Sequence, residues 1–125
     1  MAERRALICE DDPSIRTLVK TVVKREGFTV DTAEDGREGL EKLADGCYDL
    51  LVLDLMMPGV DGYSVMKQLT ESRPAQLKRI IVMTAAADAI RHGLRHPVCT
   101  ILAKPFDIAE LTAAVHRCAT ECSIE

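Results

Sequence analysis

The feature that most constrains the fold of this chain is a short aliphatic run with almost no alternation of polar and apolar residues. Residues 49–53 read DLLVL, so four apolar side chains follow one another. A strand with one face in water alternates polar and apolar residues, whereas a strand of a parallel sheet that is covered on both faces does not. The run therefore predicts a buried strand between two layers of helices.

Four other short apolar runs recur along the chain, and amphipathic segments separate them. The expected strands are residues 6–9, 28–30, 49–53, 79–83 and 98–103. Apolar residues at helical spacing predict helices from 13 to the stop at Gly27, at 36–44, at 62–72, within 86–95 and from 108 to 122. Five strand–helix pairs joined by right-handed crossovers predict an α/β fold. We expect a single doubly wound, five-stranded parallel sheet of order 2-1-3-4-5, which is flavodoxin-like.

Length and composition limit the classes of function. The chain has 125 residues and is expected to form one domain, residues 1–125. A net charge of −4 and only four aromatic residues disfavour direct nucleic-acid binding, which needs positive charge and stacking side chains. No apolar run approaches the roughly 20 residues that span a membrane, and no signal peptide is visible. We therefore expect a cytoplasmic protein without membrane contact.

The five cysteines lie at positions 9, 47, 99, 118 and 122, and none forms a CxxC pair. An odd number of cysteines without that spacing indicates neither a disulfide framework nor a zinc site. His116, Cys118 and Cys122 leave a metal site open as an alternative. Because both of these cysteines share the apolar stripe of the last expected helix, core packing is favoured.

Polar side chains follow four of the five expected strands, at the point where each strand ends. Glu10, Asp11 and Asp12 follow the first strand, Asp54 the third, Thr84 the fourth and Lys104 the fifth. In the order 2-1-3-4-5 these strands are neighbours, and ligands bind beyond the carboxyl ends of strands in such sheets. Asp12 precedes Pro13 in the pattern of a helix N-cap, which leaves Glu10 and Asp11 as the acidic pair. By itself, Asp54 would be interpreted as a turn cap.

Four segments carry a resemblance to a known family. They are EDDPSIR at residues 10–16, DLMMPGVDG at 54–62, TA at 84–85 and KPF at 104–106. Together, in this order and each at the end of an expected strand, they resemble the receiver domain of two-component response regulators, the CheY-like domains. The resemblance covers essentially the whole chain.

This resemblance implies a function and a set of site residues. Asp54 would accept a phosphoryl group from a phosphohistidine on a histidine kinase or histidine phosphotransfer protein, because a carboxylate is a nucleophile that forms acyl phosphates. The implied cofactor is Mg²⁺, a hard cation that prefers oxygen ligands. Asp11, Asp54 and the Met56 carbonyl would bind it directly and Glu10 through water. Lys104 would pair with the phosphoryl oxygens, Thr84 would be the switch residue, and the Lys104–Pro105 bond would be cis.

The chain departs from the family pattern between the fourth and fifth strands. Ile101 stands where the family usually has an aromatic residue, and the connection after Thr84 is shorter than is common. We therefore expect activation to appear as movement of residues 84–97. Arg91, His92, Arg95 and His96 form a basic cluster there, which is either a solvated face or a docking face. An unidentified downstream protein target would bind at the 86–103 face.

Three classes of function stay open at this point: a receiver, an aspartyl-nucleophile phosphatase and a degenerate scaffold. The chain is a stand-alone or relay receiver, or a receiver excised from a larger response regulator or hybrid kinase. An aspartyl-nucleophile phosphatase is less favoured, since such enzymes use a second Asp two residues after the nucleophile and this chain has Met56 there. A degenerate scaffold is disfavoured because every phosphorylation residue is present. No conventional enzyme is expected, only self-phosphorylation and autodephosphorylation at Asp54.

Overall fold

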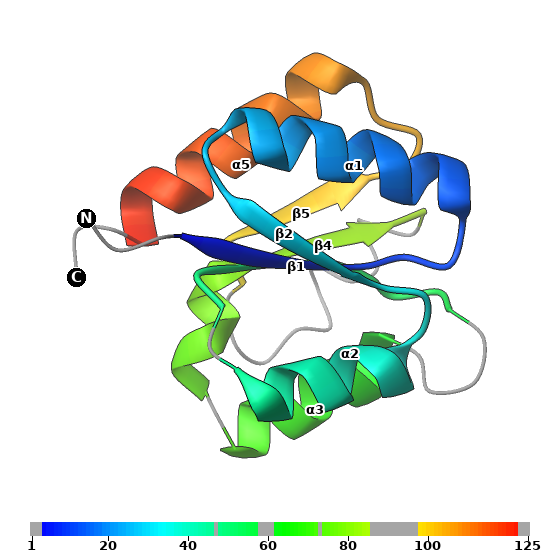
Figure 1. Ribbon diagram of the computed structural model, residues 1–125, viewed down its shortest axis with the longest axis vertical. Coiled ribbons are helices and arrows are strands. Elements are labelled where there is room, and N and C mark those ends of the chain that lie inside the picture. Colours follow the sequence, from blue (N-terminus) through cyan, green and yellow to red (C-terminus); the bar gives the residue numbers. More distant parts are fainter. Residues whose placement is uncertain (1–3, 47, 58–61, 73, 86–97, 123–125) are drawn as a thin grey trace.

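The computed structural model describes residues 4–46, 48–57, 62–72, 74–85 and 98–122 of the chain. Its five strands are β1 (Arg5–Cys9), β2 (Thr29–Ala33), β3 (Leu50–Asp54), β4 (Ile80–Thr84) and β5 (Thr100–Ala103). They form one parallel sheet of order β2-β1-β3-β4-β5, which confirms the predicted fold class. Figure 1 shows helices α1 (Pro13–Arg25) and α5 (Ile108–Cys122) on one face of this sheet, and α2 (Gly36–Asp45) and α3 (Gly62–Ser72) on the other.

Local chemistry fixes where the helices begin and end. The Asp12 carboxylate accepts hydrogen bonds from the backbone N–H groups of Ser14 and Ile15, so it caps α1 as predicted, with Pro13 in the first turn. After α1 the chain turns at Gly27, whose φ of 98° favours a residue without Cβ. A 3₁₀ helix, η1 (Pro74–Arg79), was not expected from the sequence. The helix predicted within 86–95 lies outside the described residues.

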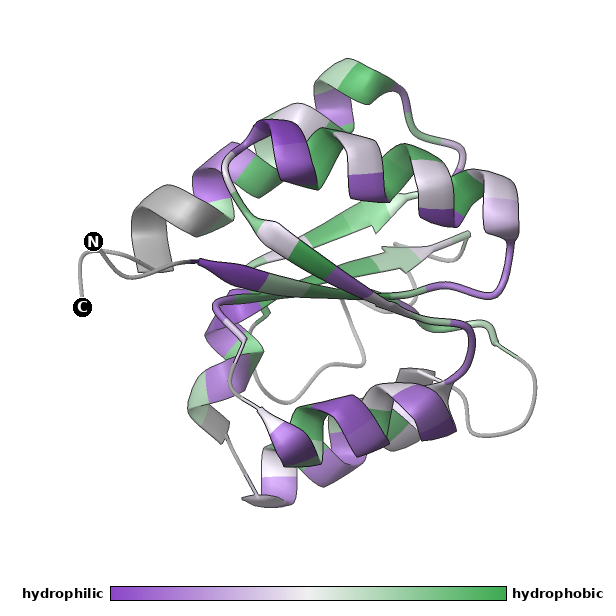
Figure 2. Cartoon of the chain, viewed as in Figure 1, coloured by the Kyte–Doolittle hydropathy of each residue, from purple (hydrophilic) through white to green (hydrophobic). Residues whose placement is uncertain are grey.

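The two apolar cores lie on opposite faces of the sheet. Leu51 and Leu53 of β3 point into the core beneath α2 and α3, whereas Leu50 and Val52 point into the core beneath α1 and α5. All five residues of β3 are buried, so the aliphatic run is explained by coverage on both faces. Figure 2 shows the resulting pattern, with hydrophobic strands between helices whose outer surfaces are hydrophilic. None of the described helices is long and apolar enough to cross a membrane.

The edge strands differ from the sequence-based boundaries. β2 runs from Thr29 to Ala33 rather than over 28–30, because its register against β1 extends from Arg5 opposite Thr29 to Cys9 opposite Ala33. Asp31 and Thr32 concealed this extension in the sequence, since polar residues are uncommon in buried strands. β5 begins at Thr100, two residues later than expected.

One prediction about the cysteines is wrong, since Cys99 and Cys118 form a disulfide. Residue spacing could not reveal this bond, because it depends on α5 packing against β5 in the fold. Cys118 does belong to the core, as predicted. His116 is mostly exposed, and its Nδ1 atom lies 3.6 Å from Glu26 Oε1. The Cys118 sulfur is bonded to Cys99, so it is no thiolate ligand for a metal in this structure. The Cys122 side chain lies outside the described structure.

A polar cluster links β1 and β2 to the start of β3. The Tyr48 hydroxyl donates a hydrogen bond to Asp31 Oδ2 at 2.7 Å, and Arg5 Nη2 donates to the same oxygen at 2.9 Å. The Arg5 guanidinium also lies over the Tyr48 ring, 4.9 Å from its centroid. The hydrogen bond from Tyr48 lowers the pKa of Asp31, with a smaller contribution from Arg5 and against the effect of burial. The ionised form of Asp31 therefore stabilises the fold.

Replacing Tyr48 with phenylalanine is expected to lower the free energy of unfolding by about 1 kcal/mol at pH 7, a figure reduced for partial exposure. The contribution is complete above the unfolded-state pKa of Asp31, about 4. It is lost as the pH falls through the lower folded-state pKa, because Asp31 is then protonated. Urea denaturation of wild type and Tyr48→Phe should therefore show a stability difference that narrows in acid. A difference that widens in acid would contradict this account.

Candidate functional site

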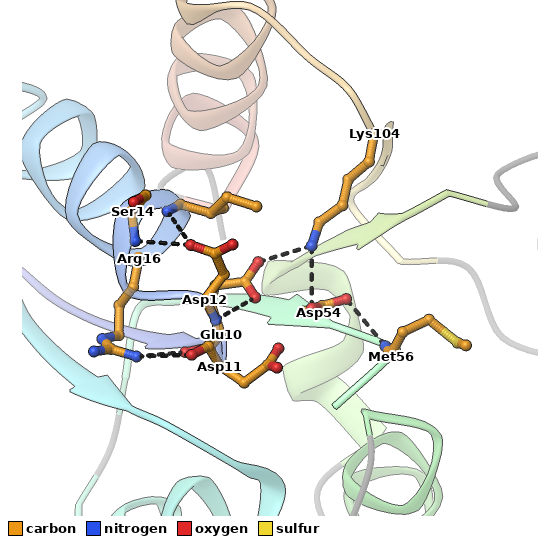
Figure 3. Close-up of polar contacts among 9 residues, drawn as sticks. Glu10, Asp11, Asp12, Ser14, Arg16, Asp54, Met56 and Lys104 are labelled. Carbon is orange, nitrogen blue, oxygen red and sulfur yellow. Dashed lines mark hydrogen bonds and ion pairs between the residues drawn. The ribbon is translucent and has the colours of Figure 1, made fainter. Parts of the chain in front are cut away.

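Three polar side chains meet where β1, β3 and β5 end. Lys104 Nζ lies 2.8 Å from Glu10 Oε1 and 3.1 Å from Asp54 Oδ2. Figure 3 shows the Lys104 side chain reaching from the end of β5 to these two carboxylates. Glu10 and Asp54 lie 94 and 50 positions before Lys104 in the sequence, so the sheet topology brings the three residues together.

Asp54 is the last residue of β3 and its side chain is almost fully buried. Its Oδ1 atom accepts a hydrogen bond from the Met56 backbone N–H at 3.0 Å, and Oδ2 accepts from Lys104. The first of these bonds is the local turn cap that an isolated Asp commonly makes. The turn-cap interpretation therefore explains the hydrogen bond of Oδ1, but it does not explain the bond between Oδ2 and Lys104.

Glu10 and Asp11 complete an acidic group around Asp54. Glu10 is fully buried, and its Oε2 atom accepts a hydrogen bond from the Asp12 backbone N–H. Asp11 is exposed, and one carboxylate oxygen from each of Glu10, Asp11 and Asp54 lies within 4.8 Å of the others. Burial raises the pKa of Glu10 to about 7, although hydrogen bonds from Lys104 and Asp12 lower it.

Lys104 is held at both its backbone and its side chain. Its backbone N–H donates to the Thr84 carbonyl at 2.9 Å, and the Lys104–Pro105 bond is cis, as the family resemblance implied. Partial burial would lower the pKa of the Lys104 ammonium, but the hydrogen bonds to Glu10 and Asp54 outweigh it and raise that pKa. The side chain is therefore a cation in this site.

The donor set fits a hard divalent cation. Three carboxylates converge and a single ammonium pairs with two of them, so an excess of two negative charges remains when all three are ionised. The available ligand atoms are all oxygen, which Mg²⁺ prefers. No thiol or imidazole is among the three clustered residues. The residues present therefore fit the metal that the resemblance implies.

Of the other residues that the resemblance singles out, Thr84, Met56 and Ile101 are described by the structure, and the basic cluster is not. Thr84 is buried at the end of β4, and the Met56 side chain is largely exposed. Ile101 is partly buried and packs against the core beneath α2 and α3. The basic cluster of Arg91, His92, Arg95 and His96, and most of the 84–97 segment, lie outside the described residues.

Two residues that sequence reasoning passed over support the site. A Cβ atom on Gly62 would lie 2.4 Å from the Asp54 carbonyl oxygen and 2.6 Å from the Leu55 Cα, so α3 begins in direct contact with the end of β3. Arg16 Nη1 donates to the carbonyl oxygens of Glu10 at 3.0 Å and Asp11 at 3.4 Å. Arg16 and Gly62 lie inside the motifs at residues 10–16 and 54–62, but their positions in the sequence do not indicate these contacts.

Comparison with known proteins identifies relatives along almost the whole chain. The family model of the response regulator receiver domain matches residues 6–116, which include Glu10, Asp11, Asp54 and Lys104. Response regulator ArlR from Staphylococcus saprophyticus is 34% identical over 113 residues, covering 89% of this chain and 50% of that protein. The chain thus spans about half the length of the curated relatives that it matches.

Solved structures show the same arrangement of the fold. Response regulator protein TrrA from Thermotoga maritima, solved in complex with Mg²⁺ and BeF, matches with a TM-score of 0.79 and 33% identity. That match covers 92% of this chain and 98% of the other. A sensor protein from Polaromonas sp. JS666 matches with a TM-score of 0.82 and 30% identity, covering 97% and 99% of the two chains.

Proposed function

This chain belongs to the response regulator receiver domain family, and from that premise we propose that Asp54 is its phosphoacceptor. The observation that carries the proposal is the position of the Asp54 carboxylate. It lies at the end of β3 within 3.1 Å of the Lys104 ammonium and beside the carboxylates of Glu10 and Asp11. A lone turn cap requires none of these neighbours.

The proposed reaction is transfer of a phosphoryl group to a carboxylate. An Asp54 oxygen attacks the phosphorus of a phosphohistidine, the new O–P bond forms as the N–P bond breaks, and the imidazole leaves. Lys104, which bonds two carboxylates at rest, would pair with the incoming phosphoryl oxygens. Phosphoryl transfer depends mainly on such positioning and charge neutralisation.

The metal-binding residues in this proposal are Glu10, Asp11, Asp54 and the Met56 carbonyl. When bound, Mg²⁺ supplies the positive charge that neutralises the phosphoryl oxygens. The burial of Glu10 and the hydrogen bond from Asp12 keep its carboxylate fixed beside Asp54. The Mg²⁺ and BeF complex of TrrA supports this assignment by analogy.

The proposed partners are a histidine kinase or a histidine phosphotransfer protein as donor, and a downstream protein that binds near residues 86–103. Thr84, at the end of β4, is the proposed link between Asp54 and that region. The Thr84 carbonyl accepts a hydrogen bond from the Lys104 backbone N–H. A movement of the Lys104 backbone on phosphorylation would therefore be transmitted through this bond to Thr84, where the following segment begins. A stand-alone receiver, a relay receiver and a receiver within a longer protein all remain compatible with this proposal.

The site assignment can be tested by chemical mapping. We expect acetyl phosphate and Mg²⁺ to add one phosphoryl group, and borohydride reduction of the acyl phosphate followed by peptide mass spectrometry to place homoserine at position 54. Chelation with EDTA is expected to abolish the adduct, because the three carboxylates then repel the incoming phosphoryl group. A modified residue other than Asp54, or an adduct formed equally well in EDTA, would contradict the proposal.

A further inference from the structure

The Cys99–Cys118 disulfide is not used by the proposed phosphoryl chemistry. Cys99 immediately precedes β5, and Cys118 lies in α5, 19 residues further along the chain. Figure 1 shows α5 on the same face of the sheet as α1, and residues of β5 and α5 share the core on that face. The Cys99 backbone N–H also donates to the Ile80 carbonyl at 3.0 Å. The bond therefore joins the beginning of β5 to the last helix.

This position makes the bond a restraint on an edge strand. β5 has only four residues, and among the described strands it pairs only with β4. Its opposite end leads directly into Lys104, whose backbone N–H donates to Thr84. A covalent link to α5 removes freedom that a short edge strand otherwise retains, and it closes a loop that contains β5 and most of α5.

The two cysteines differ in burial. Cys118 is fully buried in the core beneath α1 and α5, whereas Cys99 is only partly buried at the border of that core. Thiol–disulfide exchange requires direct attack on a sulfur atom, so the partly buried Cys99 is the residue at which we expect an external thiol to attack. Cys99 is thus the expected site of attack, and Cys118 is the buried cysteine of the pair.

Both redox states fit the surrounding structure. The two Cα atoms are 5.9 Å apart, within the usual range for a disulfide, so the bond needs no unusual backbone geometry. As thiols, the two side chains would pack as small apolar groups in the core that already surrounds them. Cys9 provides a contrast, because it is a buried free thiol whose pKa burial raises to about 12. We therefore expect Cys9 to remain a thiol in the presence of disulfides.

We propose that Cys99 and Cys118 form a reversible redox site that reacts with small-molecule disulfides of the glutathione type and locks β5 onto α5. The Cys99 thiolate attacks one sulfur of glutathione disulfide, which forms a mixed disulfide and releases one glutathione. The Cys118 thiolate then attacks the Cys99 sulfur, which forms the protein disulfide and releases a second glutathione. The two thiol protons end on the two released glutathione molecules, and the two electrons reduce the glutathione disulfide. Excess glutathione reverses the reaction through attack at Cys99.

The test uses the full chain equilibrated in buffers of defined glutathione to glutathione disulfide ratio. In oxidising buffer we expect the intact mass to fall by two hydrogens and peptide mapping to join Cys99 to Cys118, with Cys9 still a thiol. Hydrogen exchange of β5 should be slower in the oxidised form, and its melting temperature should be higher by on the order of 10 °C. Excess glutathione should reverse all of these changes.

Three variants separate the roles of the cysteines. Cys118→Ala is expected to accumulate a stable mixed disulfide on Cys99, because the resolving thiol is missing. Cys99→Ser should take up no glutathione at Cys118 and should show no shift in melting temperature between the two buffers. Cys122→Ser, a control on the same helix, should behave as the wild type. The proposal is overturned if the wild type retains glutathione on Cys99 without forming the protein disulfide. It is equally overturned if the oxidised bond joins other cysteines, or if β5 exchanges at the same rate in both states.

Discussion

Replacing Gly62 with alanine is expected to lower the free energy of unfolding by about 2 kcal/mol and to slow phosphorylation of Asp54. In most helices this substitution stabilises, because alanine has the better helix propensity by up to about 1 kcal/mol. Here the added Cβ would lie 2.4 Å from the Asp54 carbonyl oxygen and 2.6 Å from the Leu55 Cα. Both contacts are with backbone, so α3 or the end of β3 must move. The movement displaces the residue that carries the reactive carboxylate.

Gly46→Ala provides the matched control for this prediction. A Cβ at Gly46 would lie 3.1 Å from Arg5 Nη1, and its other nearest atoms belong to the same side chain. The guanidinium would therefore shift by only a few tenths of an ångström, and its hydrogen bond to Asp31 uses the other nitrogen, Nη2. Urea denaturation and acetyl phosphate labelling should therefore show a loss in Gly62→Ala and little change in Gly46→Ala. Equal stability and equal labelling of the two variants would show that the start of α3 does not hold the site in place.

Replacing Lys104 with methionine is expected to change metal binding and phosphorylation in opposite directions. The ammonium lies 2.8 Å from Glu10 and 3.1 Å from Asp54, so it competes electrostatically with a divalent cation for the same carboxylates. Its removal should tighten Mg²⁺ binding by roughly 3- to 10-fold, which corresponds to about 1 kcal/mol for one charge at this range. Phosphorylation should slow by about 100-fold, the usual effect of losing a donor that stabilises developing charge.

Lys104→Arg serves as the control because it keeps the positive charge. Its Mg²⁺ affinity should stay near that of the wild type, whereas its phosphorylation should fall because the guanidinium cannot occupy the position of the ammonium. Isothermal titration with Mg²⁺ and time-resolved labelling with acetyl phosphate separate the two effects. Unchanged Mg²⁺ affinity in Lys104→Met would contradict the competition between the ammonium and the cation.

The sheet order was predictable because each central strand is apolar on both faces. The run at Leu50–Asp54 has no polar residue before Asp54, and coverage by helices on both sides is the physical reason. β2 was harder to place, since Asp31 lies within it and finds its partners in Tyr48 and Arg5. A polar residue that is satisfied by distant side chains cannot be recognised from the local sequence.

The meeting of Glu10, Asp54 and Lys104 was also predictable, because parallel strands end at one edge of the sheet. The two hydrogen bonds of Lys104 and the burial of Glu10 could not be predicted from the sequence and are known only from the structure. The same is true of the contact between Gly62 and the end of β3, which depends on how α3 packs. The Cys99–Cys118 disulfide was missed for the same reason, as spacing carries no information about the approach of α5 to β5.

The most direct measurement of the central claim is the intact mass of wild type and Asp54→Asn after incubation with acetyl phosphate and Mg²⁺. Asparagine is nearly the same size as aspartate and retains an oxygen that can accept the Met56 hydrogen bond, but it cannot form an acyl phosphate. The account predicts one phosphoryl adduct in the wild type and none in Asp54→Asn. An adduct of equal yield in the variant would contradict the assignment of Asp54 as the phosphoacceptor.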